Sequence, residues 1–251
     1  MTPPKVLLVE DDDAVRRFVQ AALEDIAVEL HMTSGIADAV ARLAAAPFAL
    51  VLTDLMLAGE SGRTLVQRLQ REPALGGGPL VAVYSAGLTP DVCAELSRLG
   101  AWRMLHKPVP VADLRQCIRD AVGLSPPAAA DAPRAKPQAQ ASRSRPAPAG
   151  VVESYFGGNE RIYLGYREAC EQQFPADVAE GDRAVAAQDP QAMRRLAHTL
   201  KSVLQALGHT QAADMARAID IACVKNEWPG VLQQWPVLRA TLVGLGAVAC
   251  G

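Results

Sequence analysis

The chain has 251 residues, of which 50% are hydrophobic and 21% charged, and its formal net charge is −2. This length allows one large domain or two of ordinary size. Lys and Arg are scattered along the chain, which argues against a nucleic-acid partner, and the sequence contains no run of about 18 apolar residues for membrane insertion. The five cysteines are widely spaced without a C-x-x-C pair, so we expect reduced thiols in a cytoplasmic protein.

Short apolar runs alternate with helical patterns through residues 1–122. Strands are predicted at 6–9, 28–32, 49–52, 80–83 and near Met104, and helices at 14–23, 36–45, 64–69, 90–99 and 111–122. Such an alternation predicts an α/β domain with a doubly wound, five-stranded parallel sheet and helices on both of its faces.

Hydrophobic periodicity stops between residues 123 and 150. Fifteen of these 28 residues are Ala or Pro, and none is aromatic. Because such a segment cannot bury a core, we expect a flexible linker at 123–150. A random coil of this length spans roughly 30 Å, which would let the flanking domains meet within one molecule.

Only helical patterns remain in residues 151–251. Capping residues at helix starts are predicted at Asn159, at Asp189-Pro190, at Thr210 and before Pro229, and Gly208 is placed to end a helix. The pattern predicts an all-α domain, a four-helix bundle with a shorter helix near 151–156.

Polar residues follow four of the predicted strands, where the functional crevice of an open parallel sheet lies. They are Glu10 and Asp11, Asp54, Ser85, and Lys107. Carboxylates gathered in this way repel one another, and a hard divalent cation such as Mg²⁺ would relieve that repulsion. A carboxylate beside Mg²⁺, a hydroxyl and an ammonium can attack a phosphoryl group, so the cluster predicts an aspartyl phosphate.

Residues 5–122 closely resemble the receiver domain of bacterial response regulators, which has a flavodoxin-like fold. The matching positions are Val9-Glu10-Asp11, Asp54 with Gly62 eight residues on, Ser85-Ala86, and Lys107-Pro108, whose bond would be cis. The resemblance implies that Asp54 is the phosphoacceptor, Ser85 the switch hydroxyl and Lys107 the phosphate contact. It also implies a Mg²⁺ site made by Glu10, Asp11, Asp54 and the main-chain carbonyl of Met56.

Two positions depart from the receiver pattern. Met104 stands where an aromatic switch residue is usual, and Ala58 stands where Pro is usual. Two other interpretations of the acidic cluster are open. Asp11, Asp12 and Asp13 could form a solvated turn and helix cap, or Asp54 could be the nucleophile of a metal-dependent hydrolase. The hydrolase is disfavoured because Met56 occupies the position of its general acid.

A histidine, His198, lies in the predicted helix at 189–207. The apolar stripe of this helix comprises Met193, Leu196, Ala197, Leu200, Leu204 and Leu207. His198 falls on the opposite side between Arg194 and Lys201, so we expect a solvent-facing imidazole flanked by two cations. Such cations disfavour protonation of the ring and would steady a phosphoryl group on it.

Residues 151–245 resemble the histidine-containing phosphotransfer (HPt) domain. The resemblance rests on Gly157-Gly158-Asn159-Glu160, on Asp189-Pro190, on residues 195–201 and on Leu207-Gly208. It implies that His198 is the phosphorylated histidine and Lys201 its accompanying lysine, with Arg194 also supporting the phosphate. Ser202 departs from the pattern, because Gly is common there. Its hydroxyl would either crowd the site or donate a hydrogen bond.

Together the two resemblances imply a two-component phosphorelay protein. An upstream sensor histidine kinase would phosphorylate Asp54, and His198 would carry the group to or from a receiver aspartate, with another receiver or HPt domain as relay partner. The receiver would catalyse its own phosphorylation and dephosphorylation. No kinase ATP site is expected, because Gly76-Gly77-Gly78 lacks the Lys and Ser of a phosphate loop. The alternative is a receiver-type regulator whose helical bundle is a degenerate, non-phosphorylated partner-binding module.

Overall fold

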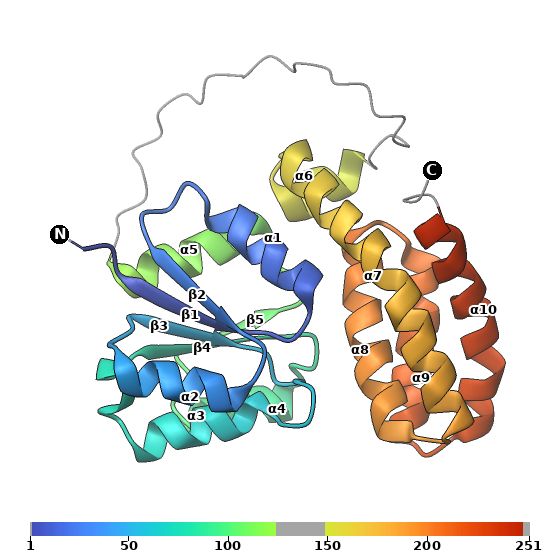
Figure 1. The fold of residues 1–251 in the computed structure, drawn as a ribbon, viewed down its shortest axis with the longest axis horizontal. Coiled ribbons are helices and arrows are strands. Elements are labelled where there is room, and N and C mark those ends of the chain that lie inside the picture. Colours follow the sequence, from blue (N-terminus) through green and yellow to red (C-terminus); the bar gives the residue numbers. More distant parts are fainter. Residues whose placement is uncertain (1, 124–148, 248–251) are drawn as a thin grey trace.

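The computed structural model describes residues 2–123 and 149–247, which form an α/β domain followed by a helical bundle (Figure 1). Gly123 ends the last helix of the first domain, and Ala149 begins the first helix of the second. Most of the predicted linker, residues 124–148, lies outside the described residues.

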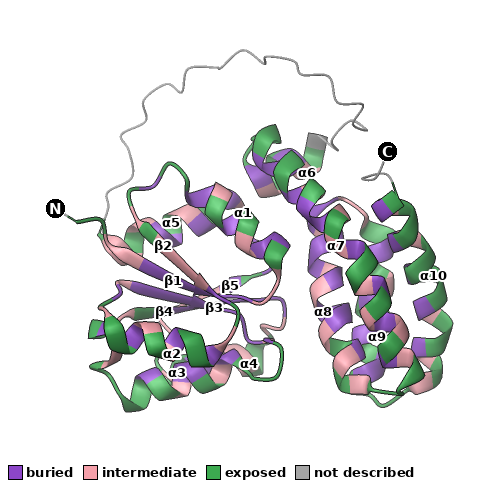
Figure 2. Ribbon diagram, in the orientation of Figure 1, coloured by how far each residue is buried: buried purple, intermediate pink, exposed green. Residues whose placement is uncertain are grey.

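Five parallel strands form the sheet of the N-terminal domain, in the order β2-β1-β3-β4-β5. They are β1 (Lys5–Val9), β2 (Glu29–Thr33), β3 (Leu50–Thr53), β4 (Leu80–Ser85) and β5 (Arg103–His106). The central strands are buried along nearly their whole length (Figure 2). Their continuous apolar runs are explained by this burial on both faces, and the predicted doubly wound sheet is confirmed.

Helices cover both faces of the sheet (Figure 1). One face carries α1 (Asp13–Leu23) and α5 (Val111–Val122), and the other carries α2 (Ile36–Ala45), α3 (Gly62–Arg71) and α4 (Pro90–Arg98), with a short turn η1 (Leu75–Gly77) before β4. Helix α3 begins earlier than predicted because the Ser61 side chain accepts a hydrogen bond from Arg63 N and caps the helix there.

The bundle consists of α7 (Glu160–Ala186), α8 (Pro190–Ala206), α9 (Thr210–Val224) and α10 (Trp228–Gly246), preceded by the short α6 (Ala149–Phe156). Asn159 and Asp189 cap α7 and α8 through their side chains, as predicted. At the start of α9, however, the cap position is His209, and Thr210 is the first helical residue. Within the described ranges, no helix combines the length and apolarity needed to cross a bilayer.

The two domains pack against each other through α1 and α7. Phe18 of α1 packs against both Phe156 of α6 and Tyr166 of α7, with ring centroids 5.8 Å and 5.4 Å away. At the rim, Arg161 Nη2 donates to Glu24 Oε2 at 3.2 Å. One hydrophobic cluster therefore runs from the α1 side of the sheet into the bundle.

Candidate functional site

A buried lysine, Lys107, forms ion pairs with two of the acidic residues that follow the strands. Lys107 Nζ, just after β5, donates to Glu10 Oε2 at 2.5 Å and to Asp54 Oδ2 at 2.6 Å. These residues meet because β1, β3 and β5 are parallel and end at one edge of the sheet. All three side chains are buried, and the ammonium also lies 4.8 Å from the centre of the Tyr84 ring. The Lys107-Pro108 bond is cis, as expected.

Charge and burial shift the pKa values of Asp54 and Lys107 in opposite directions. Burial alone would raise the pKa of Asp54, but the charge and hydrogen bond of Lys107 lower that pKa below its ordinary value. Burial would likewise lower the pKa of Lys107, but Asp54 and Glu10 outweigh burial and raise it. The pair is therefore an ionised carboxylate beside an ammonium at neutral pH.

Asp11 and the loop after β3 complete the cluster. Asp54 Oδ1 accepts a hydrogen bond from Met56 N at 3.1 Å, and Asp11 Oδ2 accepts one from Ala58 N at 2.8 Å. Ser85 is fully buried at the end of β4, with its hydroxyl 3.4 Å from Gly87 N. The carboxylates, the hydroxyl and the amine predicted from the strand ends thus lie at one edge of the sheet, while Asp12 serves as the cap of α1.

The charges of the cluster fit a divalent cation. Burial, opposed by Lys107 and assisted by the charge of Asp54, raises the pKa of Glu10 to about 8. Burial and the charge of Asp54 also raise the pKa of Asp11, against the Ala58 hydrogen bond. Within residues 2–123 and 149–247, no three His, Cys, Asp or Glu side chains are placed to hold a metal together. Mg²⁺ needs no such trio, because it commonly binds through one or two carboxylates and keeps several waters.

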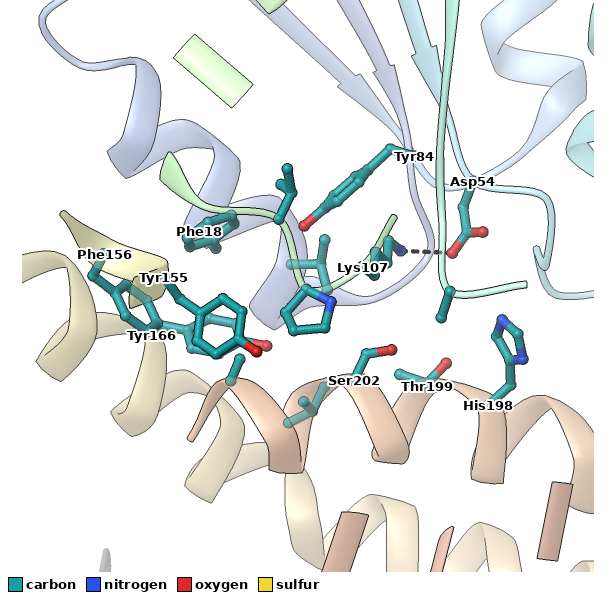
Figure 3. A pocket seen from close by; sticks show the side chains of 16 residues that line it. Phe18, Asp54, Tyr84, Lys107, Tyr155, Phe156, Tyr166, His198, Thr199 and Ser202 are labelled. Carbon is teal, nitrogen blue, oxygen red and sulfur yellow. Dashed lines mark hydrogen bonds and ion pairs between the residues drawn. The ribbon is translucent and has the colours of Figure 1, made fainter. Parts of the chain in front are cut away.

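His198 is buried, with 5% of its surface exposed, so the predicted solvent-facing imidazole is wrong. The prediction failed because the side of α8 that carries His198 lies outside the bundle core but is covered by the N-terminal domain. Figure 3 shows His198, Thr199 and Ser202 lining one side of a cavity whose other side holds Asp54 and Lys107. The histidine and the aspartate therefore face a common space between the domains.

A carboxylate that sequence reasoning missed, Asp220 of α9, orients the imidazole. Its Oδ2 lies 3.2 Å from His198 Nδ1 and accepts a hydrogen bond from Lys201 Nζ at 2.9 Å. Burial would raise the pKa of Asp220, but the hydrogen bonds from His198 and Lys201 lower it to about 2. Asp220 can only accept a hydrogen bond and the Lys201 ammonium can only donate one, and both lie near Nδ1. When Nδ1 donates its proton to Asp220, the lone pair of the neutral ring is on Nε2.

The two predicted cations have different places around this histidine. Lys201 Nζ lies 3.1 Å from His198 Nδ1 and is held by Asp220. Arg194 reaches only the far oxygen of that carboxylate, Oδ1, with its Nε at 3.5 Å. Asp220 interrupts an apolar stripe of α9 that includes Ala216, Ile219 and Cys223. An acidic residue within an apolar stripe is the sequence signal that could have identified Asp220 as a buried partner of His198.

Two family models match the chain. The response regulator receiver domain matches residues 6–119, and the Hpt domain matches residues 165–246. The response regulator receiver protein CpdR of Brucella abortus is 33% identical over 112 residues, covering 44% of this chain and 89% of CpdR. The response regulator protein PilR of Pseudomonas aeruginosa is 32% identical over 134 residues, covering 53% of this chain and 29% of PilR.

One relative spans both domains. The sensory/regulatory protein RpfC of Xanthomonas campestris pv. campestris is 26% identical over 227 residues, which cover 83% of this chain. The matched region makes up 29% of the length of PilR and 29% of RpfC. The fold and the two domain types are those of two-component phosphorelay signalling proteins. The chain belongs to the response regulator receiver family, and its receiver domain is followed by an Hpt domain.

Proposed function

We propose that the chain passes a phosphoryl group between Asp54 of the receiver and His198 of the Hpt domain. The observation that carries the proposal is the shared cavity, onto which an ionised aspartate beside a lysine and an imidazole with a free lone pair both open. Two side chains of this chemistry are the donor and acceptor that a relay requires.

Phosphorylation of Asp54 is an attack by its carboxylate oxygen on the phosphorus of a donor. The new O–P bond forms as the donor's bond to phosphorus breaks, and the donor leaves with that electron pair. Lys107 lies within 2.6 Å of Asp54 Oδ2, so its ammonium would offset the charge of the bound phosphoryl oxygens. The Ser85 hydroxyl, buried at the end of β4, would donate to one of them.

Receiver domains bind Mg²⁺ for phosphorylation, and we extend this requirement to the present chain. Asp11, Asp54 and the main-chain carbonyl of Met56 would hold the ion, with Glu10 beside them. When bound, the ion supplies positive charge that neutralises the phosphoryl oxygens. The raised pKa of Glu10 and that of Asp11 support this assignment, because burial, assisted by the charge of Asp54, disfavours their ionised forms and a bound cation would favour them.

His198 would take the group on Nε2. Its lone pair attacks phosphorus, an N–P bond forms, and the O–P bond to Asp54 breaks with the electron pair returning to the carboxylate. The ring keeps its proton on Nδ1 and becomes positively charged, and Asp220 stabilises that charge. Lys201 and Arg194, which both pair with Asp220, would support the phosphate by adding positive charge on the Nδ1 side of the ring.

We also propose the setting of this chemistry. The receiver would occupy residues 1–122, a linker 123–150 and the Hpt domain 151–251, in a cytoplasmic protein. A sensor histidine kinase would supply the phosphoryl group, and another receiver or Hpt domain would exchange it with His198. The similarity of the chain to the sensor histidine kinase AruS of Pseudomonas aeruginosa supports such partners.

The test is to label the whole chain with radioactive acetyl phosphate in the presence of Mg²⁺. Acyl phosphate on Asp54 is removed by alkali or hydroxylamine, whereas phosphohistidine survives alkali and is lost in acid. We expect both kinds of label in the wild type, only alkali-labile label in His198→Gln, and neither in Asp54→Asn. An unlabelled wild type would contradict the proposal, and label confined to Asp54 would favour a degenerate bundle.

A further inference from the structure

Both proposed phosphoacceptors are enclosed by the packing of the two domains. Asp54 and His198 are each 5% exposed, and each lies on the side of its own domain that faces the other. His198 Nε2 is buried and has no hydrogen-bond partner within residues 2–123 and 149–247. The proposed nucleophilic nitrogen therefore ends in the space between the domains.

The receiver has room for this imidazole because residue 87 is a glycine. A Cβ atom placed on Gly87 would lie 3.0 Å from His198 Cε1, 3.4 Å from His198 Nε2 and 3.9 Å from Ser85 Oγ. The first distance is shorter than ordinary van der Waals contact, so a side chain at position 87 would push the histidine away. The imidazole thus sits against the loop that follows Ser85.

Aromatic packing holds the two domains together beside this site. Phe18, Phe156 and Tyr166, which we call the aromatic clasp, meet edge to face or tilted, and all three are buried. Phe18 comes from the receiver, and the other two come from the Hpt domain. The rim pair of Arg161 and Glu24 is mostly exposed and contributes little, so the clasp holds the domains together more strongly than this ion pair does.

We propose that the Hpt domain of this chain is the resident occupant of its own receiver's phosphorylation face. This inference rests on the proposed function and adds a regulatory consequence. Docking favours transfer between Asp54 and His198 of one molecule, and it excludes any second histidine-bearing helix from Asp54. The bundle of the same chain must therefore leave before a phosphohistidine on another protein can reach the receiver, or before His198 can reach another receiver.

Two whole-chain variants separate transfer between molecules from transfer within one. His198→Gln, labelled on Asp54 by acetyl phosphate and freed of reagent, is the donor, and Asp54→Asn, with His198 intact, is the acceptor. Transfer between them uses only the receiver of the donor and the bundle of the acceptor. The clasp can therefore be broken in the two unused domains, by Phe156→Ala in the donor and Phe18→Ala in the acceptor.

We expect this opened pair to transfer about tenfold faster than the pair with intact clasps, because the fraction of molecules able to meet a partner rises. The reversed placement, Phe18→Ala in the donor and Phe156→Ala in the acceptor, damages the surfaces that transfer uses and should give no such gain. Leu164→Ala, on the same helix as Tyr166 but exposed, is the matched control and should leave the rate unchanged.

Gly87→Val in the acceptor provides a second opening variant that leaves the aromatic core intact. The inference would be overturned if the pair opened at the clasp and the pair opened by Gly87→Val both transferred at the same rate as the intact pair. Small-angle scattering gives a readout that needs no phosphate: Phe156→Ala or Gly87→Val should increase the radius of gyration of the chain. If the wild type stays unlabelled but both variants still expand, the proposed function alone is refuted. An unchanged radius in both variants would refute the docking.

Discussion

Replacing Asp220 by Asn tests the carboxylate that orients His198. Hydrogen bonds from His198 and Lys201 lower the pKa of Asp220 from an ordinary value of 3.8 to about 2. A shift of this size corresponds to about 2.4 kcal/mol, which solvent screening reduces to about 1–2 kcal/mol. We expect Asp220→Asn to lower the free energy of unfolding by that amount at pH 7, as measured by urea denaturation.

The pH dependence of this loss has a defined sign. A carboxyl group whose pKa is lower in the folded state stabilises the fold above its unfolded pKa, and the benefit disappears as the pH falls through the folded value. The stability difference between wild type and Asp220→Asn should therefore be constant above about pH 5 and shrink between about pH 4 and pH 2. A difference that grows on acidification would refute the assignment.

Phosphoryl transfer should respond to the same substitution. The Asn side-chain oxygen can still accept a hydrogen bond from Nδ1–H, but it cannot neutralise the imidazolium that forms. A hydrogen bond to a charged group is worth about 1.5–3 kcal/mol. We expect His198 labelling to slow by about tenfold to a hundredfold, with Asp54 labelling unchanged. The control is Asp214→Asn, an exposed carboxylate on the same helix paired with Arg217, which should change both quantities little. Equal effects of the two variants would refute the role of Asp220.

Three other predictions follow from the site. Ser202→Gly should keep alkali-stable label on His198, because the buried hydroxyl it removes has no hydrogen-bond partner within the described residues; loss of the label would show that the phosphoryl group needs this hydroxyl. Lys107→Met should cost about 3–5 kcal/mol at pH 8, where two buried carboxylates lose their cation, and less at pH 5, where they can take up protons; equal losses in urea denaturation at both pH values would contradict this. Mg²⁺ should raise the melting temperature of the wild type reversibly with EDTA, and Asp11→Asn should diminish the rise; a wild type that does not respond would contradict the proposed cation site.

The receiver half of the site could be predicted from the sequence because its geometry follows from local patterns. Apolar runs marked the strands, and parallel strands end at one edge, so Glu10, Asp54 and Lys107 had to lie near one another. The bundle half was harder. Its helices were predicted from periodicity and caps, but the lateral alignment that brings Asp220 of α9 beside His198 of α8 depends on packing between helices.

The error about His198 has a similar cause. Periodicity along α8 separates the face that packs into the bundle from the face that points away from it. It carries no information about a second domain that covers the outer face. The burial of His198 depends on residues far away in the sequence, including Gly87, whose missing side chain leaves space for the ring.

The position of Phe18 has a consequence for fragments of this protein. Helix α1 buries one side against the sheet, and Phe18 packs on rings that belong to the Hpt domain. A receiver expressed without that domain would expose this phenyl ring together with the rest of the α1 surface that α7 covers, and a contiguous apolar patch favours self-association. A truncated receiver would therefore have binding properties that the intact chain lacks, and its partners in a pull-down would include artefacts of truncation.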